Sequence, residues 1–160
     1  MIDRTALPYR PCVGVMLVNQ QGQAFVGKRI DNREGDFWQM PQGGIDKGED
    51  LHDAAFRELW EETGVVPAHA EIIAQTREEL FYDLPDELLG KLWNGRYRGQ
   101  RQHWILARFI GTDVDIKLDA HEPPEFCKWK WVEPATLPDL IVVFKKPVYE
   151  AVLTEFSGLI

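Results

Sequence analysis

Apolar residues near the start of the chain follow the pattern of two β-strands joined by a turn. The run Pro11–Val18 is apolar and valine-rich, and it ends at the polar segment Asn19–Gly22. The next run, Ala24–Arg29, has the length and position of a hairpin partner. Phe37–Met40 reads as a short third strand, because Pro41 and a glycine pair follow it directly.

The segment Asp50–Thr63 has the periodicity of an amphipathic helix. Apolar residues recur every four positions on one face, at Leu51, Ala55 and Leu59. Asp50 is suited to cap the first turn of this helix, and Gly64 is suited to end it.

Three further strands and a second helix are predicted downstream. The strands cover Ile72–Glu79, Gln102–Ile110 and Lys128–Trp131, and the strict alternation in the last one places both of its tryptophans on one side of a sheet. Val148–Phe156 is amphipathic, and Pro147 suits the first turn of a helix there. Because helices and strands are mixed without regular alternation, we expect an α+β fold or an α/β/α sandwich. A length of 160 residues fits a single domain over residues 1–160.

The composition is that of an ordinary globular protein, with 44% hydrophobic and 28% charged residues. It argues against disorder, a collagen-like repeat or a coiled coil. No apolar run approaches the roughly 18–20 residues that span a bilayer, and the first residues lack the pattern of a secretory signal. We therefore expect no membrane partner. Cys12 and Cys127 lack Cys or His neighbours at metal-ligand spacing, so we expect two buried, reduced thiols and a cytoplasmic location.

The formal net charge of −8 disfavours non-specific binding to nucleic acid, which depends on Lys and Arg neutralising phosphates. We therefore expect no DNA partner. A phosphate-rich substrate would need either a local cationic patch or a bound metal ion. This requirement directs attention to carboxylates that hold divalent cations.

Three glutamates gather on one side of the first predicted helix. At about 100° per residue, Glu58, Glu61 and Glu62 fall within an arc of about 100°. Like charges at this spacing destabilise a helix slightly, and a hard cation such as Mg²⁺ prefers oxygen ligands of this kind. Arg57 stands four residues before Glu61 and is placed to hold that carboxylate. The alternative is a solvated acidic face, which is the common meaning of a glutamate-rich helix.

The segment before the helix favours the metal site over the solvated face. Gly43–Glu49 is a glycine-rich loop that leads directly into the acidic helix. Glycines allow backbone carbonyls and amides to approach a metal or a phosphate closely, so Gly43 joins the candidate metal contacts. The loop and helix together outline a site for phosphate and metal.

The loop and helix together match the complete signature of the Nudix hydrolases, whose fixed positions over 23 residues fall here at Gly43, Glu49, Arg57, Glu58, Leu59, Glu61, Glu62, Gly64 and Val65. The resemblance implies an α/β/α sandwich with a mixed central sheet and a catalytic loop–helix–loop. It implies Mg²⁺ or Mn²⁺ held by Glu58, Glu61 and Glu62, and attack of water on a diphosphate. It assigns an orienting role to Arg57 and loop support to Glu49. The general base is one of the helix glutamates or a glutamate from another loop.

Outside this signature the chain resembles the bacterial RNA pyrophosphohydrolases and the plant-type asymmetric diadenosine tetraphosphate hydrolases. The resemblance covers nearly the whole chain, and the segments that carry it include Tyr9–Pro11, Trp38–Gly44, Leu92–Gly95, Gly99–Trp104, Pro124–Phe126 and Phe144–Tyr149. One departure is His103, which stands where these relatives usually carry Lys. If that lysine contacts phosphate, the contact here is weaker and depends on pH.

These segments supply further candidate residues. The resemblance makes Glu125 an additional metal ligand or the general base, although an exposed loop glutamate is often inert. Tyr82 and Phe144 are candidates for stacking on nucleobases, with core packing as the alternative. The remaining substrate-binding candidates are Arg10, Arg29, Gln100 and Lys145. Trp129 and Trp131 are expected to pack without a chemical role, and His52, His69 and His121 to lie at the surface.

The sequence thus predicts a Mg²⁺- or Mn²⁺-dependent hydrolase of phosphoanhydride bonds whose product is a 5′-monophosphate. The substrate is a nucleoside polyphosphate, either the 5′-triphosphorylated end of RNA, which loses pyrophosphate, or diadenosine tetraphosphate, which gives ATP and AMP. Alternatives are another nucleoside diphosphate derivative, or a catalytically silent fold that senses nucleotides. The sequence leaves the oligomeric state open, with a monomer favoured.

Overall fold

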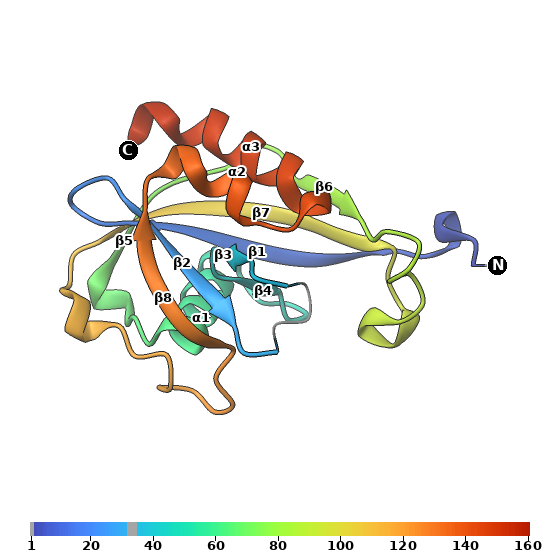
Figure 1. The fold of residues 1–160 in the computed structure, drawn as a ribbon, viewed down its shortest axis with the longest axis horizontal. Coiled ribbons are helices and arrows are strands. Elements are labelled where there is room, and N and C mark those ends of the chain that lie inside the picture. The colour runs from blue at the N-terminus through green and yellow to red at the C-terminus, as the bar shows by residue number, and fades with distance from the viewer. Residues whose placement is uncertain (1, 32–34) are drawn as a thin grey trace.

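Two long neighbouring strands, β1 (Tyr9–Val18) and β7 (Gly99–Phe109), form the centre of the fold. They run parallel, with Tyr9 opposite Gly99 and Val18 opposite Arg108. The protein is seen in a computed structural model that describes residues 2–31 and 35–160 (Figure 1). The other strands are β2 (Ala24–Arg29), β3 (Trp38–Gln39), β4 (Gln42–Gly44), β5 (Ala70–Gln75), β6 (Leu80–Asp83) and β8 (Phe126–Val132).

All remaining strand pairs are antiparallel, so the sheet is mixed, as expected. Its main path is β3-β2-β1-β7-β5, while β4 pairs with β1, β6 with β7 and β8 with β2. The strand predicted over Ile72–Glu79 extends four residues too far, because β5 ends at Gln75 and a turn precedes β6. Thr76 ends β5 by exchanging hydrogen bonds with the backbone of Trp104, at 2.9 and 3.0 Å. β5 and β6 therefore cover successive parts of the same edge of β7.

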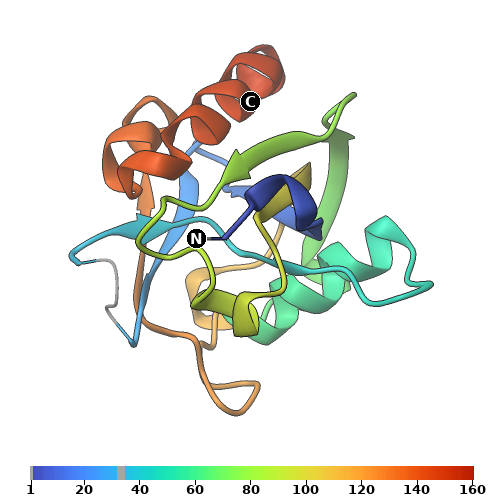
Figure 2. The ribbon, with the colours of Figure 1, turned by 90° about the vertical axis from the view of Figure 1, so that its right-hand side faces the viewer.

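The helices lie on both sides of this sheet, α1 (Leu51–Thr63) on one face and α2 (Leu137–Leu140) with α3 (Lys146–Phe156) on the other (Figure 2). The predicted ends of α1 are confirmed. The Asp50 side chain accepts hydrogen bonds from two backbone amides of the first turn, at 3.0 and 3.3 Å. Gly64 takes the left-handed conformation with φ of 75° that ends a helix. The α/β/α sandwich is thus the observed architecture.

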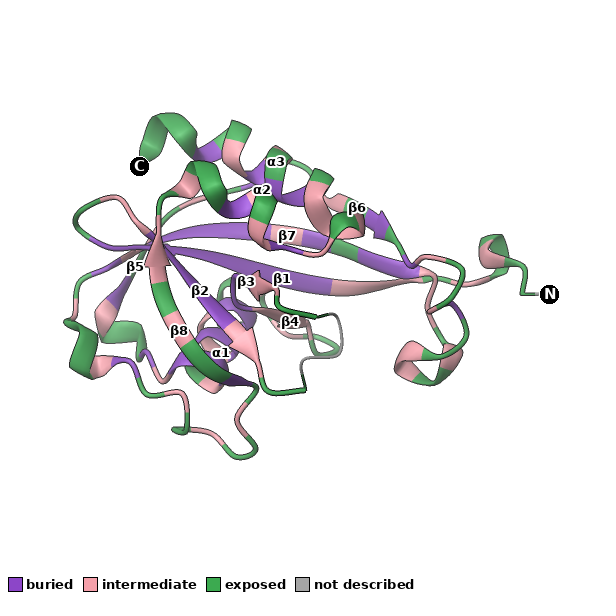
Figure 3. Ribbon diagram, in the orientation of Figure 1, coloured by how far each residue is buried: buried purple, intermediate pink, exposed green. Residues whose placement is uncertain are grey.

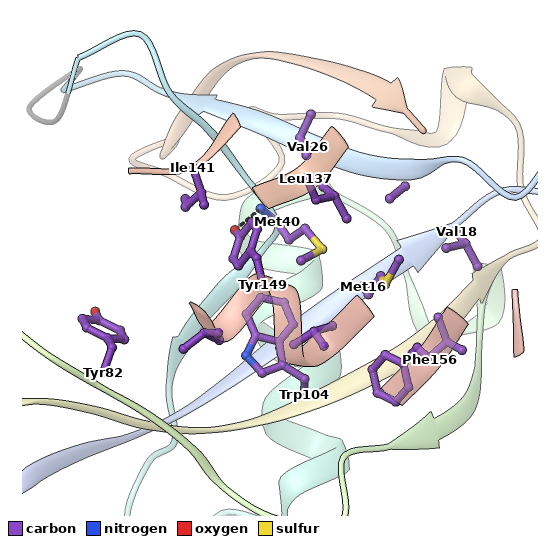
Figure 4. Close-up of a cluster of buried hydrophobic side chains, with 14 of the residues drawn as sticks. Met16, Val18, Val26, Met40, Tyr82, Trp104, Leu137, Ile141, Tyr149 and Phe156 are labelled. Carbon is purple, nitrogen blue, oxygen red and sulfur yellow. Dashed lines mark hydrogen bonds between the residues drawn. The ribbon is translucent and has the colours of Figure 1, made fainter. Parts of the chain in front are cut away.

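Each face of the sheet has its own hydrophobic core. Buried residues line both β1 and β7 along most of their length (Figure 3). One cluster packs between the sheet and α2–α3 and includes Met16, Trp104 and Phe156 (Figure 4). The other packs against α1 and includes Leu59 and Phe109. This double burial explains why β1 reads as a continuous apolar run rather than an alternating strand.

The burial predicted from the sequence for two tryptophans and two cysteines is confirmed only in part. Trp129 and Trp131 are half-buried and pack on the α1 side, where they meet Phe25. The prediction of two buried thiols is wrong for one of them, since Cys12 is buried and Cys127 is exposed on β8. Within the described part of the chain, the helices lack the length and apolar character that a membrane span requires.

Candidate active site

The glycine-rich loop and α1 form a single packed unit. Gly43 lies in β4, which pairs with β1 through Val13. A Cβ atom at Gly43 would overlap the carboxylate of Glu58, so only glycine allows this glutamate to lie against the loop. The loop thus brings its backbone beside the acidic face of the helix.

Arg57 ties the loop to the helix through its whole guanidinium group. Its Nε and Nη2 contact the two oxygens of Glu49 at 2.8 and 2.9 Å, and Nη2 also donates to the carbonyl of Gly44 at 2.8 Å. Nη1 donates to Glu58 at 2.8 Å and to Glu61 at 3.3 Å. The paired hydrogen bonds from Arg57 lower the pKa of Glu49 to about 2. Arg57 therefore holds Glu61, as expected, and three further groups.

Burial and mutual repulsion disfavour the charged forms of two site carboxylates. Glu58 is 6% exposed, and burial raises its pKa to about 7, although Arg57 opposes the shift. Glu62 is fully buried, and its pKa is raised well above the usual value by burial and then by Glu125 and Glu58. Glu125 is an exposed residue directly before β8, yet its charge reaches both helix glutamates. Three carboxylates from two distant segments thus lie within electrostatic range of one another.

The donor set fits a hard divalent cation, which residues 58, 61, 62 and 125 would hold together with the backbone of Gly43. Glu62 Oε1 is buried without a hydrogen-bond partner among the described residues. A cation would offset the repulsion that, after burial, raises the pKa values of Glu58 and Glu62. As placed in the structure, no three His, Cys, Asp or Glu side chains of the described residues form a ready-made metal cluster. Glu58 and Glu61 each direct one oxygen toward Arg57 instead.

A pocket of about 550 Å³ opens over these carboxylates. It joins acidic, cationic and aromatic residues from both halves of the chain. Its lining comprises Arg10, Arg29, Gln42, Gly43, Gly44, Glu58, Glu61, Tyr82, Leu84, Pro85, Glu87, Leu88, Leu92, Trp93, Gln100, Glu125, Val142, Phe144 and Lys145. Every candidate substrate-binding residue from the sequence is in this set, while Arg57, Glu49 and Glu62 lie behind it.

One wall of the pocket is aromatic and cationic. The rings of Tyr82 and Phe144 lie 5.6 Å apart, and Lys145 Nζ is 5.8 and 5.7 Å from their centres. Tyr82 is 7% exposed, whereas Phe144 is half-buried at the edge of the core. Gln100 and Arg10 stand level with Tyr82 across neighbouring strands. Phe144 therefore both packs on the core and faces the pocket.

The other cationic candidates differ in their surroundings. The guanidinium of Arg10 lies 5.6 Å from the ring centre of Trp93. Arg29 forms two hydrogen bonds with Asp31, at 3.1 and 2.9 Å, so part of its charge is compensated. His103 lies outside the pocket lining, because it points to the opposite face of β7 from Gln100. A phosphate contact at His103 therefore has no support in the structure.

Sequence reasoning missed part of the pocket. The loop between β6 and β7 supplies Leu88, Leu92 and Trp93, and Trp93 and Asn94 adopt the left-handed conformation with φ of 52° and 58°. Such backbone in bulky residues is strained and often found at functional sites. The available signal was Trp93 itself, a large aromatic residue before an Asn-Gly pair. Gln42 was also missed, because a neutral amide gives no pattern in one sequence.

The sandwich fold, the glycine-rich loop and the acidic helix beneath the pocket together form the arrangement that the sequence predicts for a phosphate-and-metal site. The model of the NUDIX domain matches residues 8–152. The chain therefore belongs to the Nudix family and is an enzyme that acts on pyrophosphate bonds. The prediction that the chain is an active enzyme, and not a catalytically silent nucleotide sensor, is confirmed for the class of bond that it cleaves.

Close relatives cover almost the whole chain. A protein named RNA pyrophosphohydrolase from Novosphingobium aromaticivorans is 68% identical over 154 residues, 96% of this chain and 96% of the relative. One of the same name from Erythrobacter litoralis is 60% identical and covers 99% of this chain and 96% of its own.

Similar solved structures show the same fold at low identity. The Ap4A hydrolase of C. elegans in a binary complex has a TM-score of 0.67 at 20% identity and covers 94% of this chain and 99% of its own. The dihydroneopterin triphosphate pyrophosphohydrolase of E. coli has a TM-score of 0.69 at 17% identity and covers 92% and 99%.

Proposed function

We propose that this enzyme removes pyrophosphate from the 5′-triphosphorylated end of RNA and leaves a 5′-monophosphate. The observation that supports it is the single pocket in which carboxylates, cations and aromatic rings converge. The substrate is suggested by the shared name of the relatives at 60–68% identity. Asymmetric cleavage of diadenosine tetraphosphate to ATP and AMP demands the same chemistry, and its rate is one arm of the test below.

The carboxylates provide the reactive part of the site. Glu58, Glu61, Glu62, Glu125 and the backbone of Gly43 would hold Mg²⁺ or Mn²⁺, and a bound cation would neutralise phosphate charge and polarise the attacked phosphorus. Glu58 or Glu125 accepts the proton of the attacking water. A raised pKa near 7 suits Glu58 to this task, since a base is most effective when its pKa is close to the working pH.

The positions of Arg57 and Glu49 suit them to orient these groups rather than to react. Arg57 contacts Glu58 and Glu61 from behind the pocket lining, so it fixes the rotamers of both carboxylates. Glu49 fixes Arg57 in turn through two hydrogen bonds. Such a preorganised arrangement lowers the cost of assembling the site during the reaction.

The pocket wall provides recognition. Lys145 and Arg10 bind phosphate oxygens, and Arg29 adds a partly compensated charge. Phe144 and Tyr82 stack on the first bases, with Gln100 donating a hydrogen bond beside them. This limited grip fits a net charge of −8, because an acidic protein binds an RNA end more readily than a long RNA backbone.

A side-by-side comparison of kcat/KM tests the proposal. The substrates are 5′-triphosphorylated RNA, diadenosine tetraphosphate, a nucleotide sugar and a deoxynucleoside triphosphate, each with Mg²⁺, with Mn²⁺ and in EDTA. We expect the highest kcat/KM on RNA and loss of turnover in EDTA. A higher value on diadenosine tetraphosphate would reassign the substrate. Full turnover in EDTA would contradict the role of the carboxylates.

A further inference from the structure

A chain of buried hydrogen bonds runs along one face of β7 toward the pocket. Gln100, Gln102 and Trp104 are alternate residues of this strand, so they project from the same face. Trp104 Nε1 donates to Gln102 Oε1 at 2.8 Å, and Gln102 Nε2 donates to Gln100 Oε1 at 2.6 Å. Gln102 Nε2 also donates to Gln42 Oε1 at 3.1 Å. All three side chains on β7 are at most 3% exposed.

The direction of this chain follows from the indole group at its buried end. An indole N–H donates and cannot accept, whereas either end of an amide can face a neighbour. Trp104 therefore requires the oxygen of Gln102, and the nitrogen of Gln102 is then directed to Gln100. Gln100 must therefore accept this hydrogen bond with its side-chain oxygen. One donor-only group thus determines the orientation of two amides.

The indole group is well fixed as an anchor. A Cβ atom at Gly14 on the neighbouring strand β1 would overlap the ring of Trp104, so the ring lies directly against the backbone. On another side Tyr149 of α3 makes an edge contact, with ring centres 5.7 Å apart (Figure 4). A ring held in this way has little freedom to turn its N–H elsewhere.

The other end of the chain opens to the substrate. Gln100 lines the pocket, and no described residue accepts a hydrogen bond from its Nε2. This N–H group is therefore available to donate to a group that enters the pocket. We propose that Trp104, acting through Gln102, is a positioning residue that fixes Gln100 as a hydrogen-bond donor to an acceptor atom of the nucleotide. This inference rests on the proposed function, and the acceptor is either a phosphate oxygen or an atom of the nucleoside.

A double-mutant cycle on KM tests whether Trp104 acts through Gln100. Trp104→Phe removes the indole donor, and Gln100→Met removes the amide. Each single variant should raise KM for triphosphorylated RNA about 2- to 10-fold, the effect of one hydrogen bond, with a smaller change in kcat. In the Gln100→Met background, Trp104→Phe should raise KM by a clearly smaller factor. The same factor in both backgrounds would overturn the inference.

A second variant guards against misfolding of Trp104→Phe. Gln102→Met keeps the approximate side-chain volume and breaks the same chain, so it should reproduce the cycle. Gln21→Met, at an exposed turn, is the matched control and should leave KM unchanged. Wild-type enzyme that fails to turn over triphosphorylated RNA contradicts the proposed function. If the wild-type enzyme is active and Trp104→Phe raises KM by the same factor in both backgrounds, the inference is wrong while the proposed function stands.

Side-chain ¹⁵N NMR of the wild-type protein gives a test that needs no variant. The probes are the α,β-methylene analogue of GTP, which resists hydrolysis, and inorganic triphosphate, each with Mg²⁺. The amide signals of Gln100 should move on binding, while the Trp104 indole signal stays. Movement with both probes assigns the acceptor to phosphate, and movement with the GTP analogue alone assigns it to the nucleoside. Gln100 signals that stay in place would contradict the inference, whether the signals of other pocket residues move or stay in place as well.

Discussion

Glu62 presents the sharpest conflict between stability and chemistry at the scale of single residues. It is fully buried, one of its oxygens has no partner among the described residues, and its pKa is raised well above the usual value. Its neutral form is therefore favoured in the folded protein without metal. An acid whose pKa is raised by folding supports stability below its unfolded pKa, near 4.5, and this support is lost as the pH rises.

Glu62→Gln should consequently separate stability from activity. In EDTA at pH 8 the variant should melt several degrees higher than the wild type, and the difference should disappear near pH 4.5 because Glu62 is then neutral. With Mg²⁺, its activity should fall about 10²–10⁴-fold. Thermal melts across this pH range and kcat measurements test both parts. If Glu62→Gln retains half of the wild-type kcat, Glu62 has a structural role and not a catalytic one.

Phe144 tests base recognition, because it combines a core contact with a face on the pocket. If it stacks on a base, Phe144→Ala should raise KM for RNA and for diadenosine tetraphosphate about 5- to 150-fold. Inhibition by inorganic triphosphate, which has no base, should change little. The melting temperature is measured on the same preparation. A destabilised protein with unaltered KM would show that Phe144 only packs.

At the scale of elements, the loop and α1 act as one unit because Arg57 and Glu49 connect them. Glu49 accepts two hydrogen bonds from Arg57, and its pKa is lowered to about 2. An acid whose pKa is lowered by folding supports stability above its unfolded pKa, near 4.5, and this support is lost as the pH falls toward 2.

Glu49→Gln should therefore lower the free energy of unfolding at pH 7. The deficit should shrink as the pH falls below 4.5 and should vanish only below pH 2, where the wild-type carboxylate is also protonated in the folded protein. Denaturant melts over this range measure the deficit. Glu71→Gln, an exposed change on β5, is the control and should show no such dependence. A deficit that is constant with pH would mean that the Arg57 pair contributes nothing.

At the scale of the whole molecule, two hydrophobic cores lie on opposite faces of one sheet. The two thiols differ in accessibility, because one lies in a core and the other at the surface. Cys12 is fully buried on β1, and burial raises the pKa of its thiol to about 11. Cys127 is exposed on β8. Native protein should thus show one fast and one very slow thiol toward a disulfide reagent. Cys127→Ser should abolish the fast phase, and two fast thiols would contradict the described packing.

The sequence alone determined the features that depend on local periodicity. Asp50 and Gly64 fix the ends of α1, and the spacing of Glu58, Glu61 and Glu62 fixes their common side, because a helix has one geometry. The two-sided burial of β1 follows from its unbroken apolar run. These parts of the fold and of the carboxylate site needed no knowledge of distant contacts.

Tertiary structure decided what depends on residues far apart in the chain. Glu125 meets Glu62 because β8 pairs with β2 at the edge of the sheet, and no local pattern encodes that pairing. The break between β5 and β6 follows from the length of β7, which two short strands share. The orientation of Gln100 follows from an indole four residues away, because hydrogen-bond direction passes through side chains that only the folded sheet aligns.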